Sequence, residues 1–388
     1  MSARFGCKRE SIALNLKAVL PRLARKIKGA EMNPCLTVNL DKIESNARVV
    51  KNLCASFGIE VLGVTKVFCG EPVIALILAE CGISSLGDSR LDNIERYRDV
   101  SAEKWLLRMP CISDVRRCVE LCDVSLNSEL ETLKALNREA LRQKKKHKVV
   151  LMADLGDLRE GCIDEDDFFS CADFARKAEG LELFGVGTNL TCFSFVQSDP
   201  QNLSRLVRLA KECGSPCVVS GGNSAAIKLM TQGGIPEGVN HLRLGESILF
   251  GRERADFTYL DGTVNDAFII EAEVIECKEK PSMPIGTIGK NSYGVRPAFT
   301  DKGKRLRAIC SMGRQDVDEQ TMWPIDSGIE IVGASSDHFV ADVTEAERVF
   351  KAGDKIAFRL GYFATMRAFT SSYVEKRFAK GCIIGSYR

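Results

Sequence analysis

Histidine is scarce in this sequence, which has only three among its 388 residues: His147, His241 and His338. Ser-His-Asp triads and histidine-rich zinc sites need histidines beside specific partners, so both classes of site are poorly supported. The chain has 16 cysteines but no Cys-x-x-Cys motif. The closest pairs, such as Cys118 with Cys122, have no histidine at the spacing of a zinc site. We therefore expect no metal.

The sequence also lacks an excess of charge, because 54 Lys and Arg balance 52 Asp and Glu. This balance gives no electrostatic reason to expect a nucleic-acid or anionic-membrane partner. No apolar run approaches the roughly 20 residues that span a bilayer, and no signal peptide opens the chain. The cysteines are scattered through apolar stretches and form no compact disulfide framework. We expect a soluble, cytoplasmic protein with reduced thiols.

Residues 1–31 form a basic stretch with eight Lys or Arg and two Glu. Its apolar side chains recur at helical spacing, at Ile12, Leu16, Val19, Leu23 and Ile27. This pattern predicts a basic amphipathic helix as an N-terminal extension.

Strand-like and helix-like segments alternate from residue 61 to residue 245. The predicted strands are 61–66, 84–88, 105–109, 124–127, 149–155, 183–189, 217–221 and 242–245. Eight such alternations are typical of an α/β fold of the (β/α)8 TIM-barrel type, with a doubly wound open sheet as the alternative. We assign the barrel to residues 32–255.

Beyond Gly251 the pattern changes to strand-like segments with turn residues between them, at 267–277, 307–312, 339–343 and 355–360. Few helical periods interrupt these segments. We assign residues 256–388 to a mostly β C-terminal domain, which a short predicted strand at 35–40 can join.

Polar residues follow the predicted barrel strands at their carboxyl ends, where TIM barrels carry their chemistry. They are Lys66, Asp88, Arg108, Asn127, Asp154 (followed by Arg159), Asn189, Ser220 and Arg243. A partly desolvated lysine loses its proton more readily, and its amine can form a Schiff base with an aldehyde cofactor. A solvated strand cap is the ordinary alternative for Lys66.

Two of these strand ends suggest a ligand. The run from Ser220 through Gly222 and Asn223 to Ser224 precedes a predicted helix, so backbone N–H groups can approach an anion such as phosphate. An ordinary glycine turn is the other interpretation. Arg243 stands between two leucines on a predicted buried strand, where it needs either a ligand or a structural ion-pair partner.

In order, these motifs resemble the fold-type III amino-acid racemases that depend on pyridoxal 5'-phosphate (PLP), the alanine racemase superfamily, over residues 33–388. Lys66 in Gly-Val-Thr-Lys-Val matches the family's cofactor-anchoring lysine, and Asn223-Ser224 matches its phosphate-binding segment. Arg243-Leu-Gly245 resembles the signature whose arginine faces the pyridine nitrogen. The resemblance implies a PLP site formed by Lys66, Asn189, Ser220, Gly222, Asn223, Ser224, Arg243, Gly245 and Tyr362.

The resemblance extends into the second domain. Ser-Tyr293-Gly resembles the motif whose tyrosine is the second catalytic acid/base and comes from the partner subunit. A homodimer with composite sites and two bases, Lys66 and Tyr293, is implied. Substrate binding is expected from Arg159 and from Ser336 in Ser-Ser336-Asp337-His, with Asp337 as a candidate partner for a basic side chain.

The segment Gly187-Thr188-Asn189 has asparagine in place of a histidine of the alanine enzymes. In this it resembles the family branch that racemises ornithine. Residues 67–70 lack the phosphate-binding tyrosine of the alanine enzymes, and Met152 replaces their carbamylated lysine. We therefore expect racemisation of ornithine or another basic amino acid. The alternatives are an alanine or serine racemase, a fold-type III decarboxylase, and a non-catalytic single-barrel protein that handles the cofactor. That last group lacks a C-terminal β domain.

Overall fold

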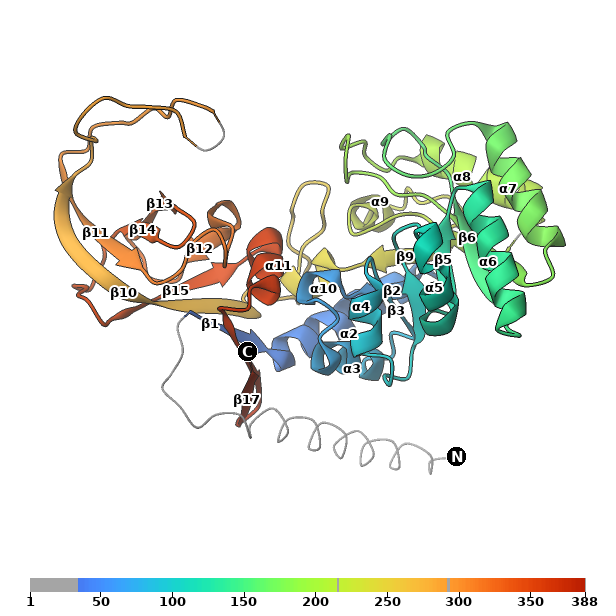
Figure 1. Cartoon of the computed structure of the whole chain (residues 1–388), viewed down its shortest axis with the longest axis horizontal. Coiled ribbons are helices and arrows are strands. Elements are labelled where there is room, and N and C mark those ends of the chain that lie inside the picture. The colour runs from blue at the N-terminus through green and yellow to red at the C-terminus, as the bar shows by residue number, and fades with distance from the viewer. Residues whose placement is uncertain (1–33, 215, 292–293, 388) are drawn as a thin grey trace. The chain divides into compact units, whose positions relative to one another are not determined.

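The structure is a computed structural model that describes residues 34–214, 216–291 and 294–387 (Figure 1). These residues form two compact units, one of residues 40–267 and one of residues 34–39 with 268–387. The basic helix that the sequence predicts within residues 1–31 lies outside the described residues. No helix in the described part of the chain is both long enough and apolar enough to cross a membrane.

The first unit is a closed barrel of eight parallel strands, which confirms the predicted fold class. Hydrogen bonds between the last strand and the first close the sheet, so the open-sheet alternative is wrong. The strands are β2 (Glu60–Val64), β3 (Ser85–Asp88), β4 (Glu103–Leu106), β5 (Val124–Asn127), β6 (His147–Met152), β7 (Leu181–Gly187), β8 (Val218–Ser220) and β9 (His241–Leu244).

Helices connect these strands, and local residue choices explain several of their starts. Asp199 caps α8 through a reciprocal hydrogen-bond pair with Asn202, and Pro200 occupies the first turn, where its missing N–H costs nothing. The helices are α2 (Leu40–Ser56), α3 (Pro72–Glu80), α4 (Leu91–Arg96), α5 (Val115–Leu121), α6 (Leu130–Arg142), α7 (Glu165–Lys177), α8 (Pro200–Glu212), α9 (Ala226–Thr231) and α10 (Glu246–Phe250), with short 3-10 helices η1 (Lys66–Phe68) and η2 (Ile112–Asp114).

Alternate residues of each strand fill the barrel interior, as the period of two in a strand requires. The buried cluster consists of Leu62, Val64, Trp105, Val124, Leu126, Val150, Met152 and Val218. Trp105 is the largest fully buried side chain and pairs in register with Gly87 of the neighbouring strand. Its ring stacks on His241 at 5.0 Å between centroids, and its Nε1 donates to Glu103. The barrel is therefore packed through its middle.

The second unit is a nine-stranded, mostly antiparallel sheet with one α-helix. The first strand, β1, lies between β10 and β16, and it is parallel to β16. The elements are β1 (Cys35–Asn39), β10 (Phe268–Pro281), β11 (Lys304–Cys310), η3 (Glu319–Thr321), β12 (Met322–Pro324), β13 (Glu330–Ala334), β14 (Phe339–Asp342), β15 (Lys355–Leu360), α11 (Tyr362–Thr370), β16 (Glu375–Lys380) and β17 (Ile383–Tyr387).

Replacing Gly70 with alanine should destabilise the barrel unit. Gly70 has a φ of +63°, and an added Cβ would lie 2.3 Å from the backbone oxygen of Asn93. We expect a loss of about 2–4 kcal/mol from backbone strain and overpacking together. Urea unfolding should be followed by Trp105 fluorescence in a Trp323→Phe background, since the chain has two tryptophans.

Gly58→Ala is the matched control, because Gly58 has a φ of +70° but no atom lies within 4 Å of the added Cβ. Only the strain remains there, about 1 kcal/mol. Equal losses in the two variants would mean that the close approach to Asn93 has no energetic effect.

Candidate active site

Lys66 lies at the carboxyl-terminal end of the barrel, but not on a strand. The predicted strand 61–66 is too long, because β2 ends at Val64 and Lys66 begins η1. The Thr65 N–H donates to the Gly87 carbonyl at 2.9 Å, and the Gly70 N–H donates to the Thr65 carbonyl at 3.2 Å. Cys69 ends this turn with a left-handed φ of 50°. Lys66 is thus held on a tight turn just beyond β2.

Arg243 points into the barrel from the neighbouring strand, β9, and is 5% exposed. Its Nη1 donates to Ser220 Oγ at 2.5 Å, and its Nη2 donates to the Thr188 carbonyl at 2.7 Å and, at 3.4 Å, to Asn189 Oδ1. Burial lowers the pKa of Arg243 to about 10, so the group stays cationic near neutral pH. No carboxylate among the described residues forms an ion pair with it. The oxygen atoms that accept its hydrogen bonds all belong to neutral groups.

His241 belongs to the same network, although it lies in no recognisable motif. Its Nδ1 lies 2.9 Å from Ser220 Oγ, which also accepts from Arg243. Burial, with a further contribution from Arg243, lowers the pKa of His241 to about 3. The ring is therefore neutral. His241 directly precedes the predicted strand 242–245, and no local pattern in the sequence marks it as part of the site.

The loops after β7 and β8 meet through Asn223. Its Nδ2 donates to the Leu190 carbonyl at 2.8 Å and to Asn189 Oδ1 at 3.2 Å. Ser224 follows, and its Oγ lies 3.2 Å from Ser247 Oγ and accepts from the Ser247 N–H. Ser247 is a buried hydroxyl that the sequence analysis missed.

The loops after β6 and β7 are joined by Asp157, which is fully buried. Its carboxylate accepts from the backbone N–H groups of Cys192, Phe193, Ser194 and Val196 at 2.9–3.2 Å. Arg159 and Glu160 follow on the same loop and pair with each other, with Nη2 to Oε1 at 2.5 Å. One carboxylate thus shapes two loops at the carboxyl-terminal end of the barrel.

Three of the expected polar residues do not reach the barrel interior. Leu126 packs in the core, so its strand neighbour Asn127 faces outward and donates to Ser125. Asp88 also faces outward, where it accepts from Thr65 Oγ1 at 2.6 Å and from Asn93. Arg108 is exposed beyond the end of β4. Asp88 therefore stabilises the turn that carries Lys66, through its hydrogen bond with Thr65.

The remaining expected residues belong to the second unit. Ser336 and Asp337 lie on an exposed turn, and the Asp337 carboxylate accepts from Ser336 Oγ and contacts His338. Tyr362 begins α11, with its ring 5.3 Å from that of Phe363. Tyr293 lies outside the described residues, so its position stays a prediction.

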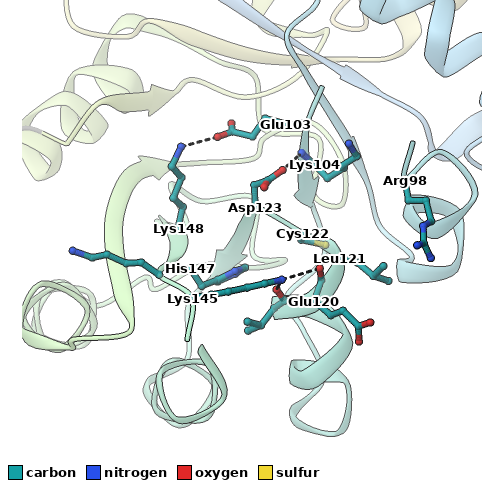
Figure 2. A pocket seen from close by; sticks show the side chains of 12 residues that line it. Arg98, Glu103, Lys104, Glu120, Leu121, Cys122, Asp123, Lys145, His147 and Lys148 are labelled. Atoms are coloured by element: carbon teal, nitrogen blue, oxygen red, sulfur yellow. Dashed lines mark hydrogen bonds and ion pairs between the residues drawn. The ribbon is translucent and has the colours of Figure 1, made fainter. Parts of the chain in front are cut away.

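A cavity of about 640 Å³ lies at the opposite, amino-terminal end of the barrel strands (Figure 2). Glu103 and Lys148 form an ion pair of 2.8 Å in its wall. Lys104 and Lys145 also line it, and their ammonium groups donate to backbone carbonyls. Trp105 and His241 occupy the barrel between this cavity and Arg243. The cavity is thus separate from the candidate site.

The donor set around Arg243 fits the PLP that the sequence motifs imply. Asn189 Nδ2 is a buried donor without a hydrogen-bond partner among the described residues. A Cβ added to Gly222 would meet no atom within 4 Å, so this backbone borders open space. Gly245 lies on the other side, next to Val64 of β2. Within the described ranges, no three His, Cys, Asp or Glu side chains gather into a metal site.

Comparison with known proteins gives consistent matches. Residues 38–253 match the family model described as alanine racemase, N-terminal domain. The ornithine racemase of Acetoanaerobium sticklandii is 43% identical over 89% of this chain and 99% of its own length. The lysine racemase of Thermotoga maritima is 39% identical over 88% of this chain and 98% of its own.

A solved structure has the same fold. It is the alanine racemase of Bartonella henselae with covalently bound pyridoxal phosphate, with a TM-score of 0.67 and 15% identity. The match covers 90% of this chain and all of that one.

Asp157→Asn should loosen the loop of residues 192–196. An amide offers one acceptor oxygen where the carboxylate offers two, and its NH2 group would face backbone donors. We expect the Phe193 and Val196 amides to exchange hydrogen for deuterium about 10- to 100-fold faster, because charge-assisted hydrogen bonds that close the loop are lost.

Asp164→Asn is the control for this exchange experiment. Asp164 caps α7 and accepts from two backbone N–H groups. Asparagine also caps helices well, so exchange in 192–196 should not change. Unchanged exchange in Asp157→Asn would refute the role of this carboxylate.

Proposed function

The chain belongs to the alanine racemase family, and we propose that it is a PLP-dependent racemase that interconverts L- and D-ornithine. The two curated relatives are named for racemisation of ornithine and lysine, which supports a basic amino acid as the substrate class. The greater identity with the ornithine enzyme favours ornithine. The resemblance of the segment around Asn189 to the ornithine branch supports the same choice.

The observation that carries the proposal is the buried Arg243. Its guanidinium is bound by a hydroxyl and a carbonyl and has no ion-pair partner among the described residues, so it can face a neutral acceptor. If the cofactor binds here, Arg243 would disfavour protonation of its pyridine nitrogen. The cofactor ring would then withdraw electrons from the substrate less strongly. Return of a proton to Cα would be favoured over side reactions such as transamination.

The residues at the carboxyl-terminal end of the barrel have distinct proposed roles. Lys66 would anchor the cofactor, and Asn223 with Ser224 would hold its phosphate. When bound, PLP withdraws electrons from the substrate and acidifies the hydrogen on Cα. Lys66 Nζ then holds or donates a proton on one face of Cα, and Tyr293 Oη does so on the other.

We further propose that two copies of the chain form a dimer with composite sites, in which Tyr293 comes from the second copy. Large apolar side chains are exposed on the loops after β6 and β7: Leu158, Ile163, Phe193 and Phe195 are 57–64% exposed. Apolar groups clustered this way are typical of a surface that another protein covers.

The test of the function is racemisation of L-ornithine by the purified protein, measured by chiral chromatography. Lys66→Ala should lose the visible absorbance of lysine-bound cofactor and lower the rate by about a thousandfold or more, because one base and the anchor are removed. Lys134→Ala, at an exposed lysine of α6, should retain both properties. A coloured, active Lys66→Ala protein would disprove the assignment, and release of CO2 would identify a decarboxylase.

Mixing two inactive variants tests the composite site. Lys66→Ala and Tyr293→Phe should each be nearly inactive as pure proteins. Co-expression should restore about a quarter of wild-type activity, because half of the dimers are mixed and each mixed dimer has one intact site. Full activity of pure Tyr293→Phe would remove this tyrosine from the reaction, and no recovery on mixing would place both bases on one chain.

A further inference from the structure

Glu160 is an acid at the carboxyl-terminal end of the barrel whose partner is the neighbouring side chain of Arg159. The carboxylate receives both Nε and Nη2 of Arg159, with Nη2 to Oε1 at 2.5 Å. The Glu160 side chain is 17% exposed and that of Arg159 is 39% exposed. A mostly buried carboxylate is costly unless a cation stays paired with it.

The pair lies on the loop that leaves β6 and returns to it. Cys162 closes this loop, with its N–H donating to Met152 and its carbonyl accepting from Asp154. Glu160 and Arg159 both act electrostatically on the buried Arg243, in opposite directions. The pair is therefore within electrostatic range of the centre of the candidate site.

Other buried acids at the carboxyl-terminal end of the barrel already bind backbone N–H groups or an arginine that stabilise the fold. Asp157 accepts four backbone N–H groups, and Asp154 accepts those of Gly156 and Leu158. Glu246 pairs with Arg252 at 2.6 Å. Among the described residues, Glu160 by contrast is held by one side chain, so its partner can change without unfolding a loop.

We propose that Glu160 binds the distal ammonium of the substrate and so selects diamino acids. This inference rests on the proposed function and on the predicted role of Arg159 at the substrate carboxylate. A diamino acid presents one carboxylate and one distal ammonium. It can separate the Arg159–Glu160 pair and replace it with two pairs, Arg159 with the carboxylate and Glu160 with the ammonium.

A neutral amino acid cannot complete this exchange. It binds Arg159 through its carboxylate, but it leaves the Glu160 carboxylate mostly buried and unpaired. Two effects then discriminate against short or apolar substrates: the cost of the unpaired Glu160 carboxylate and the absence of its contact with a distal ammonium. Specific binding sites commonly combine such unfavourable and favourable interactions. Asp337, the acid that the sequence suggested, is instead bound by its own turn.

The test compares L-ornithine with L-norvaline, which has the same carbon chain without the ammonium. In Glu160→Gln, kcat/KM for L-ornithine should fall about 10- to 100-fold, mainly through KM, as expected for loss of a charge-assisted contact. The value for L-norvaline should stay within about threefold or rise, because the unpaired charge is gone. Glu160→Asp should keep part of the ornithine preference.

Two controls accompany this variant. Glu139→Gln removes a carboxylate that pairs with Arg142 on α6, and it should leave the ornithine-to-norvaline ratio unchanged. Asp154→Asn tests the competing acid and should also leave that ratio unchanged. If Glu160→Gln does not fold, as judged by far-UV circular dichroism, Glu160→Ser serves the same comparison.

The possible failures are distinguishable. A wild-type protein that racemises norvaline but neither ornithine nor lysine would overturn the proposed function, and the Glu160 assignment with it. A wild type that racemises ornithine while Glu160→Gln keeps the same ratio would overturn the Glu160 assignment alone. Equal losses for both substrates would show that Glu160 only positions Arg159.

Discussion

A permanent cation inside the barrel constrains the structure around it. Arg243 cannot shed its charge near neutral pH, so each group that touches it must offer an electron pair. The Thr188 carbonyl and the Ser220 hydroxyl do so, and His241 stays neutral behind Ser220. The ends of β7, β8 and β9 are therefore specified together by one guanidinium. A substitution at any of them changes the environment of the other two.

The layers of the barrel separate stability from chemistry. The middle is an apolar layer around Trp105, and the layer above it, at the carboxyl ends of the strands, is polar. Polar groups in that upper layer are joined by hydrogen bonds across loops, as in the contacts of Asp157 and Asn223. Such loops keep their shape only while these few contacts persist, whereas the apolar layer is stabilised by many small ones.

Much of the barrel can be predicted from the sequence. Apolar runs that alternate with helical patterns mark eight strands, and that number is typical of a closed barrel. Side-chain direction was harder to predict: Asn127 was expected in the active site, yet the alternation with Leu126 turns it outward. Lys66 was placed on a strand because no local pattern distinguishes the last residue of a strand from the first of a 3-10 turn. The role of Asp157 depends on contacts between two loops, which a single sequence does not encode in any local motif.

The stacked rings of Trp105 and His241 have a consequence for isotope labelling. They fill the barrel, so for the proposed reaction a proton that leaves Cα can meet water only from the carboxyl-terminal end, where the loops after β6 and β7 lie. In heavy water the product takes its hydrogen from the base on the opposite face, so an original hydrogen is kept only if it passes from one base to the other before exchange with solvent. The share of such product then measures how well those loops exclude solvent during one turnover. The deuterium content of the product would thus report on the loop that Asp157 holds closed.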